Sequence, residues 1–213
     1  MIITIDGPAG SGKSSTAQAL AKKLGYFYLN SGMHYRALAF LMGDDNKVPD
    51  KIPFQYLVIN NEPKIILDGK DITDQLYNKK ISARSAEIAQ IKDAKYLLWD
   101  YQRTFKDKEP NIVAEGRDIG SELFKDADFK IFLTASDLVR AQRLLNDKNR
   151  KLVGVSLEEI IKMVQERDKK DRERELAPLV VPEGAIIIDN SNLSPELVLK
   201  QILGLIKSLN FKK

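Results

Sequence analysis

The sequence predicts an α/β protein, with a five-stranded parallel sheet covered by helices on both faces. Five short apolar runs alternate with longer segments of helical character. Runs that are apolar throughout are typical of parallel strands, because both faces of such a sheet are buried. The runs cover residues 2–5, 26–29, 111–114, 129–133 and 185–189. With 213 residues, the chain has the length of one such domain with an insertion.

The first apolar run leads directly into a glycine-rich segment, Gly-Pro-Ala-Gly-Ser-Gly-Lys-Ser at residues 7–14. This is G-x-x-x-x-G-K-[ST], the phosphate-binding loop (P-loop), and residues 15–24 after it have helical character. The glycines let backbone N–H groups point inward at phosphate oxygens, and the helix N-terminus adds partial positive charge there. Lys13 is expected to reach the outer phosphates, and the Ser14 hydroxyl to ligate Mg²⁺. The motif therefore predicts a nucleoside triphosphate site.

Composition excludes several other classes of protein. The chain has no cysteine, which rules out disulfides and thiolate zinc sites and fits a reducing compartment. No apolar stretch approaches the ~18 residues of a membrane span, and the first residues lack the basic flank of a signal peptide. The net charge of +4 suits an anionic ligand, but basic and acidic residues are interspersed. We expect a cytoplasmic monomer that binds neither nucleic acid nor membrane.

Residues 44–80 differ in character from the rest and predict a small antiparallel subdomain. Short strands are expected at residues 56–59, 64–67 and 70–73. Asn60-Asn61 and Asp68-Gly69 between them are hairpin turn signals. From residue 81 to 105 the apolar spacing predicts one helix. We therefore divide the chain into a core (1–43 and 81–213), an insert (about 44–80) and a lid (about 144–156).

Charged residues follow the ends of the expected strands, at the edge where open α/β sheets bind ligands. Arg36 lies in the first turns of a helix after the second strand, for which Ser31 is the predicted N-cap. Glu115-Gly-Arg-Asp follows the third strand. The helix capped by Ser136 carries Arg140 and Arg143 on one face. A polar connection at 146–151 precedes a capping box at Ser156 and Glu159.

The helix after Ser156 has an apolar stripe that becomes charged. The stripe at 157, 160, 161 and 164 continues into Arg167, Asp171 and Arg174, which lie within roughly 60° of one another on a helix. Two interpretations remain open here. Either this face lines a polar cleft, or the helix end is a solvated surface of salt bridges. His34, the single histidine, is assigned no role.

The P-loop alone does not distinguish ATPases, GTPases and kinases. The Asp-x-x-Gly and Asn-Lys-x-Asp motifs of GTPases are absent, and Asn46-Lys47-Val48-Pro49 fails at its last position. Arginines are instead concentrated at strand ends and in connections. Two phosphate-bearing substrates would need that many cations. Since phosphoryl transfer depends mostly on positioning and charge neutralisation, these arginines indicate a kinase.

Together these motifs resemble those of the bacterial cytidylate (CMP) kinases over nearly the whole chain. The resemblance is carried by residues 5–8, by Ser31-Gly32 with Tyr35-Arg36, by residues 115–120, and by residues 166–174 with 177–179. The hairpin at residues 67–71 looks like the family's monophosphate-binding insert. The resemblance implies a P-loop NTPase fold and transfer of the ATP γ-phosphoryl group to CMP or dCMP with Mg²⁺.

The resemblance also implies roles for individual residues. ATP would be held by Gly7, Pro8, Ala9, Gly10, Ser11, Gly12, Lys13, Ser14 and Ser15. The acceptor would be held by Ser31, Tyr35, Arg36, Ser85, Arg117, Asp118, Arg167, Asp171 and Arg174. The residues expected to act in catalysis are Lys13, Arg117, Arg140, Arg143 and Arg167, with Arg140 and Arg143 at the lid over ATP.

The chain departs from the family where the base is read. The family has Ser followed by Pro-x-x-Arg there, whereas this chain has Ser85 but neither the proline nor the arginine. Lys92 and Lys95 are candidate substitutes, although lysine lacks the planar fork of arginine. A P-loop kinase for shikimate or another nucleoside monophosphate, and a non-enzymatic nucleotide-binding module, are the alternatives. The insert argues against shikimate, and the number of arginines argues against mere binding.

Overall fold

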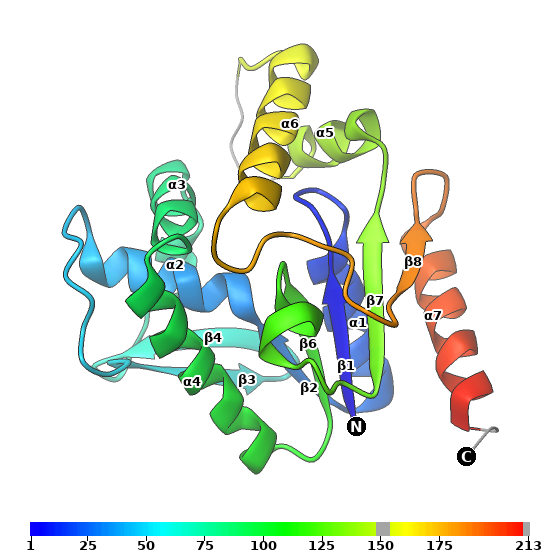
Figure 1. The fold of residues 1–213 in the computed structure, drawn as a ribbon, viewed down its shortest axis with the longest axis horizontal. Helices are drawn as coiled ribbons and strands as arrows, with labels where there is room; N and C mark the ends of the chain where they lie inside the picture. Colours follow the sequence, from blue (N-terminus) through cyan, green and yellow to red (C-terminus); the bar gives the residue numbers. More distant parts are fainter. Residues whose placement is uncertain (148–153, 211–213) are drawn as a thin grey trace.

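The computed structural model describes residues 1–147 and 154–210. Its central sheet has five parallel strands in the order β2-β6-β1-β7-β8 (Figure 1). They are β1 (Ile2–Asp6), β2 (Phe27–Asn30), β6 (Ile112–Gly116), β7 (Phe129–Thr134) and β8 (Ile186–Asp189). Each contains or overlaps one predicted apolar run, so the expected fold class is confirmed.

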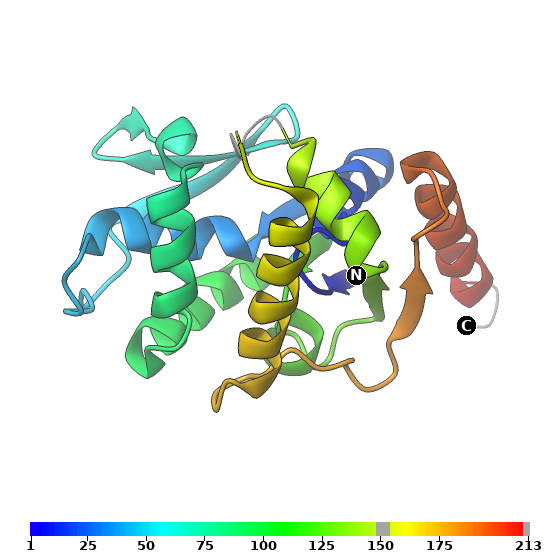
Figure 2. The same ribbon diagram turned by 90° about the horizontal axis from the view of Figure 1, so that it is seen from above.

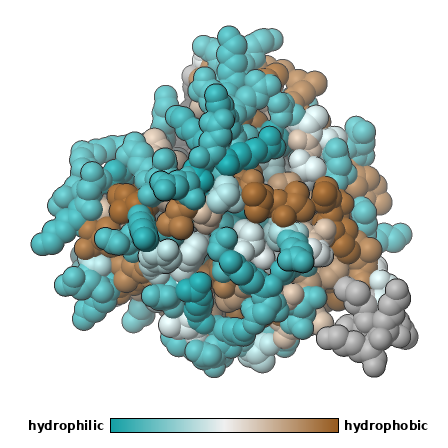
Figure 3. All heavy atoms as spheres, viewed as in Figure 1, coloured by the Kyte–Doolittle hydropathy of each residue, from teal (hydrophilic) through white to brown (hydrophobic). Residues whose placement is uncertain are grey.

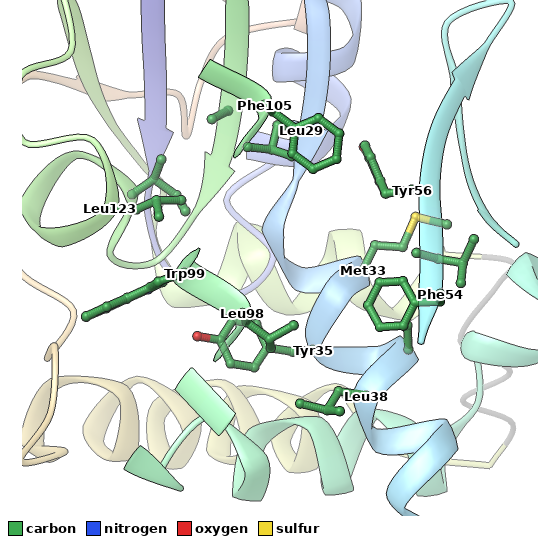
Figure 4. Close-up of a cluster of buried hydrophobic side chains, with 14 of the residues drawn as sticks. Leu29, Met33, Tyr35, Leu38, Phe54, Tyr56, Leu98, Trp99, Phe105 and Leu123 are labelled. Atoms are coloured by element: carbon green, nitrogen blue, oxygen red, sulfur yellow. The ribbon is translucent and has the colours of Figure 1, made fainter. Parts of the chain in front are cut away.

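Helices cover both faces of this sheet because its strands alternate their apolar side chains between two cores. Ile3 and Ile5 face α1 (Lys13–Leu24) and α7 (Pro195–Asn210). On the other side, α2 (Ser31–Met42) and α4 (Lys92–Lys108) pack with the short helix η2 (Ile119–Leu123) and with the insert. Figure 4 shows this second core: Met33 lies beside Phe54 of the insert, and Trp99 lies at the opposite side of the cluster.

The insert is an antiparallel three-stranded sheet, β3-β4-β5. Its strands are β3 (Phe54–Ile59), β4 (Glu62–Leu67) and β5 (Lys70–Asp71). Asn60 and Asn61 have φ of 54° and 65°, and Asp68 and Gly69 have 48° and 75°, as two-residue hairpin turns with positive φ at both positions require. The strand predicted at 70–73 is shorter. Thr73 leaves the ladder because its side chain accepts a bond from the Ile65 N–H, and the helix η1 (Thr73–Leu76) follows.

The single helix predicted for residues 81–105 is wrong: the chain forms α3 (Lys79–Ile88) and then α4. Ile91 adopts an extended conformation between them, and the chain turns. Both helices pack onto α2 from this turn. The apolar positions 88, 91, 94 and 98 keep helical spacing across the break, which is why the pattern concealed it.

Two helices stand above the carboxyl ends of the strands (Figure 1): α5 (Asp137–Leu145) and α6 (Leu157–Glu173). They pack through Ala141, Ile160 and Val164. Ser136 caps α5, and Ser156 with Glu159 forms the predicted capping box of α6. Residues 148–153 of the predicted lid lie outside the described residues. The division into core, insert and lid stays a prediction.

Within residues 1–147 and 154–210, no helix combines the length and apolar character needed to cross a membrane.

Candidate active site

The P-loop lies at the carboxyl end of β1, and two of its glycines are required by close backbone approach. A Cβ on Gly7 would lie 2.1 Å from the Leu133 carbonyl oxygen of β7. A Cβ on Gly10, whose φ is 73°, would lie 2.8 Å from the Arg140 carbonyl oxygen of α5. The loop is thereby fitted between β7 and α5. Lys13 is buried in it, and its Nζ donates to the Pro8 carbonyl at 3.1 Å.

Arg140 supports the loop from behind. The residue is 3 % exposed, and its guanidinium donates to the carbonyl oxygens of Ala9 and Ala135, each at 3.0 Å. It also pairs with Asp137 at 2.6 Å and with the buried Asp168 of α6 at 2.7 Å. These partners connect the loop, α5 and α6. In this conformation the side chain is directed at protein groups and does not line the groove described below.

Arg143 and Asn190 hold the other side of the loop. Arg143 donates to the side-chain and backbone oxygens of Asn190 at 2.9 and 3.0 Å. The Asn190 amide in turn donates to the Ser11 carbonyl at 2.9 Å. Sequence reasoning missed Asn190, whose one available signal was its position directly after the fifth apolar run.

Ser14 meets a carboxylate at the base of the loop. Its hydroxyl donates to Glu115 Oε1 at 2.8 Å, and Glu115 is buried at the end of β6. Glu115 was noted in the sequence only as part of a motif, without a role. A hydroxyl next to a carboxylate is the oxygen donor set that Mg²⁺ prefers, so these two residues fit a magnesium ion bound with a nucleotide.

All of the residues predicted to bind the acceptor line one cavity of about 130 Å³ between α2, α3 and α6. Lys13 and Ser14 line it too. The cavity adjoins a larger groove of about 1210 Å³ that runs past the P-loop and the insert, and Lys13, Ser14, Arg36 and Arg167 line both. Residues of both α3 and α6 line the groove, and these two helices lie next to each other in the view from above (Figure 2).

The charged end of α6 lines the cavity, which confirms the first interpretation of its stripe over a solvated surface. The Asp171 side chain is only 16 % exposed, and its Oδ2 accepts from Arg117 Nε at 3.0 Å. Arg174 Nη1 lies 3.9 Å from Oδ1. Burial alone would raise the pKa of Asp171, but Arg117, Arg167 and Arg174 together lower it below its usual value. Asp171 is therefore held as a carboxylate.

Positive charge is concentrated where the cavity meets the P-loop. Burial lowers the pKa of Lys13 well below its usual range, and the nearby charges of Arg117 and Arg167 lower it further. Glu115 and Asp171 oppose this shift. An anion bound between these cations would relieve their mutual repulsion.

Asp118 is fixed by two cations. Its Oδ2 lies 2.7 Å from Lys95 Nζ and 3.4 Å from Arg174 Nη2. Lys95 is completely buried in α4 and is not among the residues that line the cavity, whereas Asp118 is. The second candidate for base reading, Lys92, is exposed and lies over the Tyr96 ring.

The structure corrects the predicted cap of α2 and shows that His34 is deeply buried. Asn30, not Ser31, caps α2: its side chain accepts from the Met33 N–H at 3.0 Å, and Ser31 is the first helical residue. This leaves Ser31 at the cavity wall. His34 is fully buried among the rings of Phe54, Tyr56, Tyr101 and Phe105, and burial lowers its pKa to about 3.

The surface around the groove is polar. Hydrophilic side chains gather over α3 and α6 in the space-filling view (Figure 3). An apolar band lies below them, over the segment between α6 and β8, where Val180 and Val181 are each 45 % exposed.

Comparison with known proteins bears on this site directly. The family model described as cytidylate kinase matches residues 3–208. The cytidylate kinase of Chlamydia felis is 39% identical over 214 residues, which cover 97% of this chain and 98% of that protein. That of Pseudomonas fluorescens is 40% identical, covering 95% and 93%. That of Caldicellulosiruptor saccharolyticus is 36% identical, covering 95% and 94%.

Solved structures share the fold at low identity. Shikimate kinase from Acinetobacter baumannii, in complex with shikimate, matches with a TM-score of 0.53 and 17% identity, covering 97% of this chain and 93% of that one. Shikimate kinase from Bacteroides thetaiotaomicron matches with a TM-score of 0.52 and 14% identity, covering 97% and 98%. At these identities the likeness concerns the P-loop kinase fold alone. The sequence comparisons are decisive for the family: the chain belongs to the cytidylate kinases.

Proposed function

We propose that the chain transfers the γ-phosphoryl group of ATP to CMP or dCMP, with ATP and Mg²⁺ at the P-loop and the acceptor in the cavity. One observation carries this proposal. Lys13 and Arg167 line both the cavity and the groove beside the P-loop, and Arg117 lines the cavity with them. Transferring phosphate between two anionic substrates requires cations at that position.

The reaction needs positioning more than proton transfer. The bond between the γ-phosphorus and the β–γ bridging oxygen breaks, ADP keeps that oxygen with its electron pair, and an oxygen of the CMP phosphate bonds to the γ-phosphorus. The second pKa of a phosphate monoester is about 6, so the attacking oxygen is already ionised at neutral pH. No general base is needed, in keeping with the burial of His34 among aromatic rings.

The residues divide into those that touch substrate and those that support them. Lys13, Arg117 and Arg167 would stabilise the charge on the transferring group. Arg36, Ser31, Tyr35, Ser85, Asp118, Asp171 and Arg174 would hold the acceptor. Arg143 borders the groove beside the P-loop, whereas Arg140 would act by holding the Ala9 carbonyl and Asp168. Ser14 would ligate Mg²⁺ with Glu115 behind it, and the ion would neutralise charge on the outer phosphates.

A coupled assay of ADP release tests the proposal, with CMP, dCMP, UMP, AMP and shikimate as separate acceptors. We expect CMP and dCMP to give the highest kcat/KM, and omission of Mg²⁺ to abolish turnover. A higher kcat/KM with shikimate or AMP would show that the proposed acceptor is wrong. Nucleotide binding without ADP release from any acceptor would favour a binding module.

A further inference from the structure

Asp6 is a buried carboxylate that the mechanism above does not use. It ends β1, immediately before the P-loop, and is 0 % exposed. Its Oδ1 accepts from the Ile119 N–H at 2.8 Å and its Oδ2 from the Gly120 N–H at 2.7 Å. It does not line the cavity. Each oxygen thus holds one backbone group of the segment that follows β6.

The same residue also holds the beginning of that segment. In the sheet, Asp6 is paired with Gly116 of β6 and with Phe132 of β7, so its own backbone is fixed on both sides. Residues 116–120 are therefore tied to Asp6 at both ends, through the strand pairing at one end and through the carboxylate at the other. Arg117 and Asp118 are the two residues between these attachments.

The fit around Gly120 supports a defined position for this segment. A Cβ on Gly120 would lie 2.7 Å from Thr4 Oγ1 and 3.1 Å from Asp6 Oδ2. The backbone therefore approaches β1 too closely for any residue except glycine. Any larger residue would move the segment away from Asp6.

An ionised group at this position is costly. Burial, together with the nearby carboxylates of Asp118 and Glu115, raises the pKa of Asp6 to about 7, although the two N–H bonds lower it. An uncharged residue would pack here without that cost, and such perturbed groups concentrate at functional sites.

We propose that Asp6 is a positioning residue for the acceptor nucleotide: it holds residues 116–120 so that Arg117 and Asp118 face the cavity. The inference rests on the proposed function, because it assigns those two residues to the acceptor. It predicts that changes at Asp6 act on the acceptor and leave the donor nucleotide nearly unaffected.

The test compares Asp6→Asn with Asp128→Asn in the full chain. Asp128 is the matched control, because its Oδ2 accepts from the Ile2 N–H at 2.8 Å at the opposite end of β1. An amide at position 6 presents a donor to a backbone donor and so releases one end of the segment. We expect the CMP KM of Asp6→Asn to rise at least tenfold, with the ATP KM within about threefold of wild type. Asp128→Asn should change neither KM, even if its melting temperature falls.

Gly120→Ala is a second variant that moves the segment without changing any charge, and it carries the test if Asp6→Asn does not fold. The same tenfold rise in CMP KM is expected from it. Equal changes in both KM values, or none, in whichever variant folds would overturn the inference. The wild-type enzyme in the same assay separates the two claims: inactivity toward CMP contradicts the proposed function, whereas an active wild type with an unaffected Asp6→Asn contradicts only the role of Asp6.

Discussion

Lys95 Nζ lies 2.7 Å from Asp118 Oδ2, in an ion pair whose two side chains are 0 % and 5 % exposed. Burial lowers the pKa of Lys95, while the Asp118 carboxylate opposes this. The lysine thus holds the carboxylate from behind the cavity wall, and Asp118 itself lines the cavity proposed for the acceptor. Removing Lys95 would leave the buried Asp118 carboxylate with its longer contact to Arg174, at 3.4 Å. Removing one partner of a buried pair costs up to about 3–5 kcal/mol.

We therefore predict that Lys95→Met lowers the melting temperature and raises the CMP KM at least tenfold, while the ATP KM changes little. Lys92→Met is the matched control on the same helix, because Lys92 is exposed. It should leave both values unchanged. A strong effect of Lys92→Met on CMP would instead identify Lys92 as the residue that reads the base.

Lys13→Ala should abolish turnover while the fold survives. Lys13 donates a hydrogen bond to Pro8 of its own loop, and under the proposed function its charge would stabilise the transferring phosphate. We expect kcat to fall by at least about 100-fold, the loss typical of removing one charge-stabilising group. Circular dichroism and ADP release measured on one sample check this, with exposed Lys22→Ala as the control. Near-normal turnover of a folded Lys13→Ala would contradict the P-loop assignment.

Arg36→Met should weaken the acceptor far more than ATP. Arg36 lines the cavity and lies over the Tyr77 ring, with 5.4 Å between its guanidinium carbon and the ring centroid. Losing a charge-assisted contact costs about 2–4 kcal/mol, or roughly 30- to 1000-fold in acceptor kcat/KM. The control is Arg103→Met, a partly exposed arginine over the Trp99 ring. If ATP affinity changed instead, Arg36 would belong to the donor site.

Asp171→Ala should lower acceptor kcat/KM at least tenfold, about 1.4 kcal/mol, and leave ATP binding nearly intact. The variant removes the partner that orients Arg117, so kcat is expected to fall as well. Steady-state kinetics in both substrates check this, and Lys169→Ala provides an exposed control on the same helix. Normal acceptor kinetics would show that the pair with Arg117 serves stability alone.

The buried His34 predicts a pH dependence of stability. Its pKa is about 3 in the fold, below the usual 6.5, so the unfolded chain binds a proton first as the pH falls. The stability that neutral His34 contributes is complete above about pH 6.5 and is lost as the pH falls toward 3. His34→Phe removes this loss. From pH 7 to pH 5, the free energy of unfolding of the variant should rise by about 2 kcal/mol relative to that of wild type. Each pH unit below 6.5 changes this difference by about 1.36 kcal/mol.

Denaturant unfolding at both pH values measures that gain. No other histidine contributes, because the chain has only one. A constant difference between the two proteins would mean that His34 has the same pKa inside the fold as in the unfolded chain.

The sequence allowed the sheet and the P-loop to be predicted because their signals are local, whereas the acceptor residues were named from a family resemblance and their role stays a prediction. A buried strand is a continuous apolar run, and the P-loop motif specifies its own backbone. The break between α3 and α4 could not be predicted, since Ile88, Ile91 and Ala94 keep their helical spacing through the turn. Ser31 was chosen as a cap because it is a good one, but Asn30 is equally good and lies one residue earlier.

Long-range pairings were not predicted, even where the residues themselves were named. Lys95 reaches Asp118 across 23 residues of sequence, and Asp6 reaches Gly120 across 114. No periodicity or spacing in the sequence indicates which residue pairs with which. A lysine within an amphipathic helix ordinarily indicates solvent, and only the packing of α4 against η2 places this one inside.

The position of β1 between β6 and β7 has a consequence for synthesis of the chain. The strand, the P-loop and its helix are made before the strand's partners, which follow more than 100 residues later. At ribosomal rates, roughly 6–26 s separate residue 6 from residue 134. During that interval the loop lacks the Leu133 and Arg140 carbonyls that its glycines approach. The P-loop is thus made well before the groups that it packs against, and it can reach the conformation described here only after they have been made.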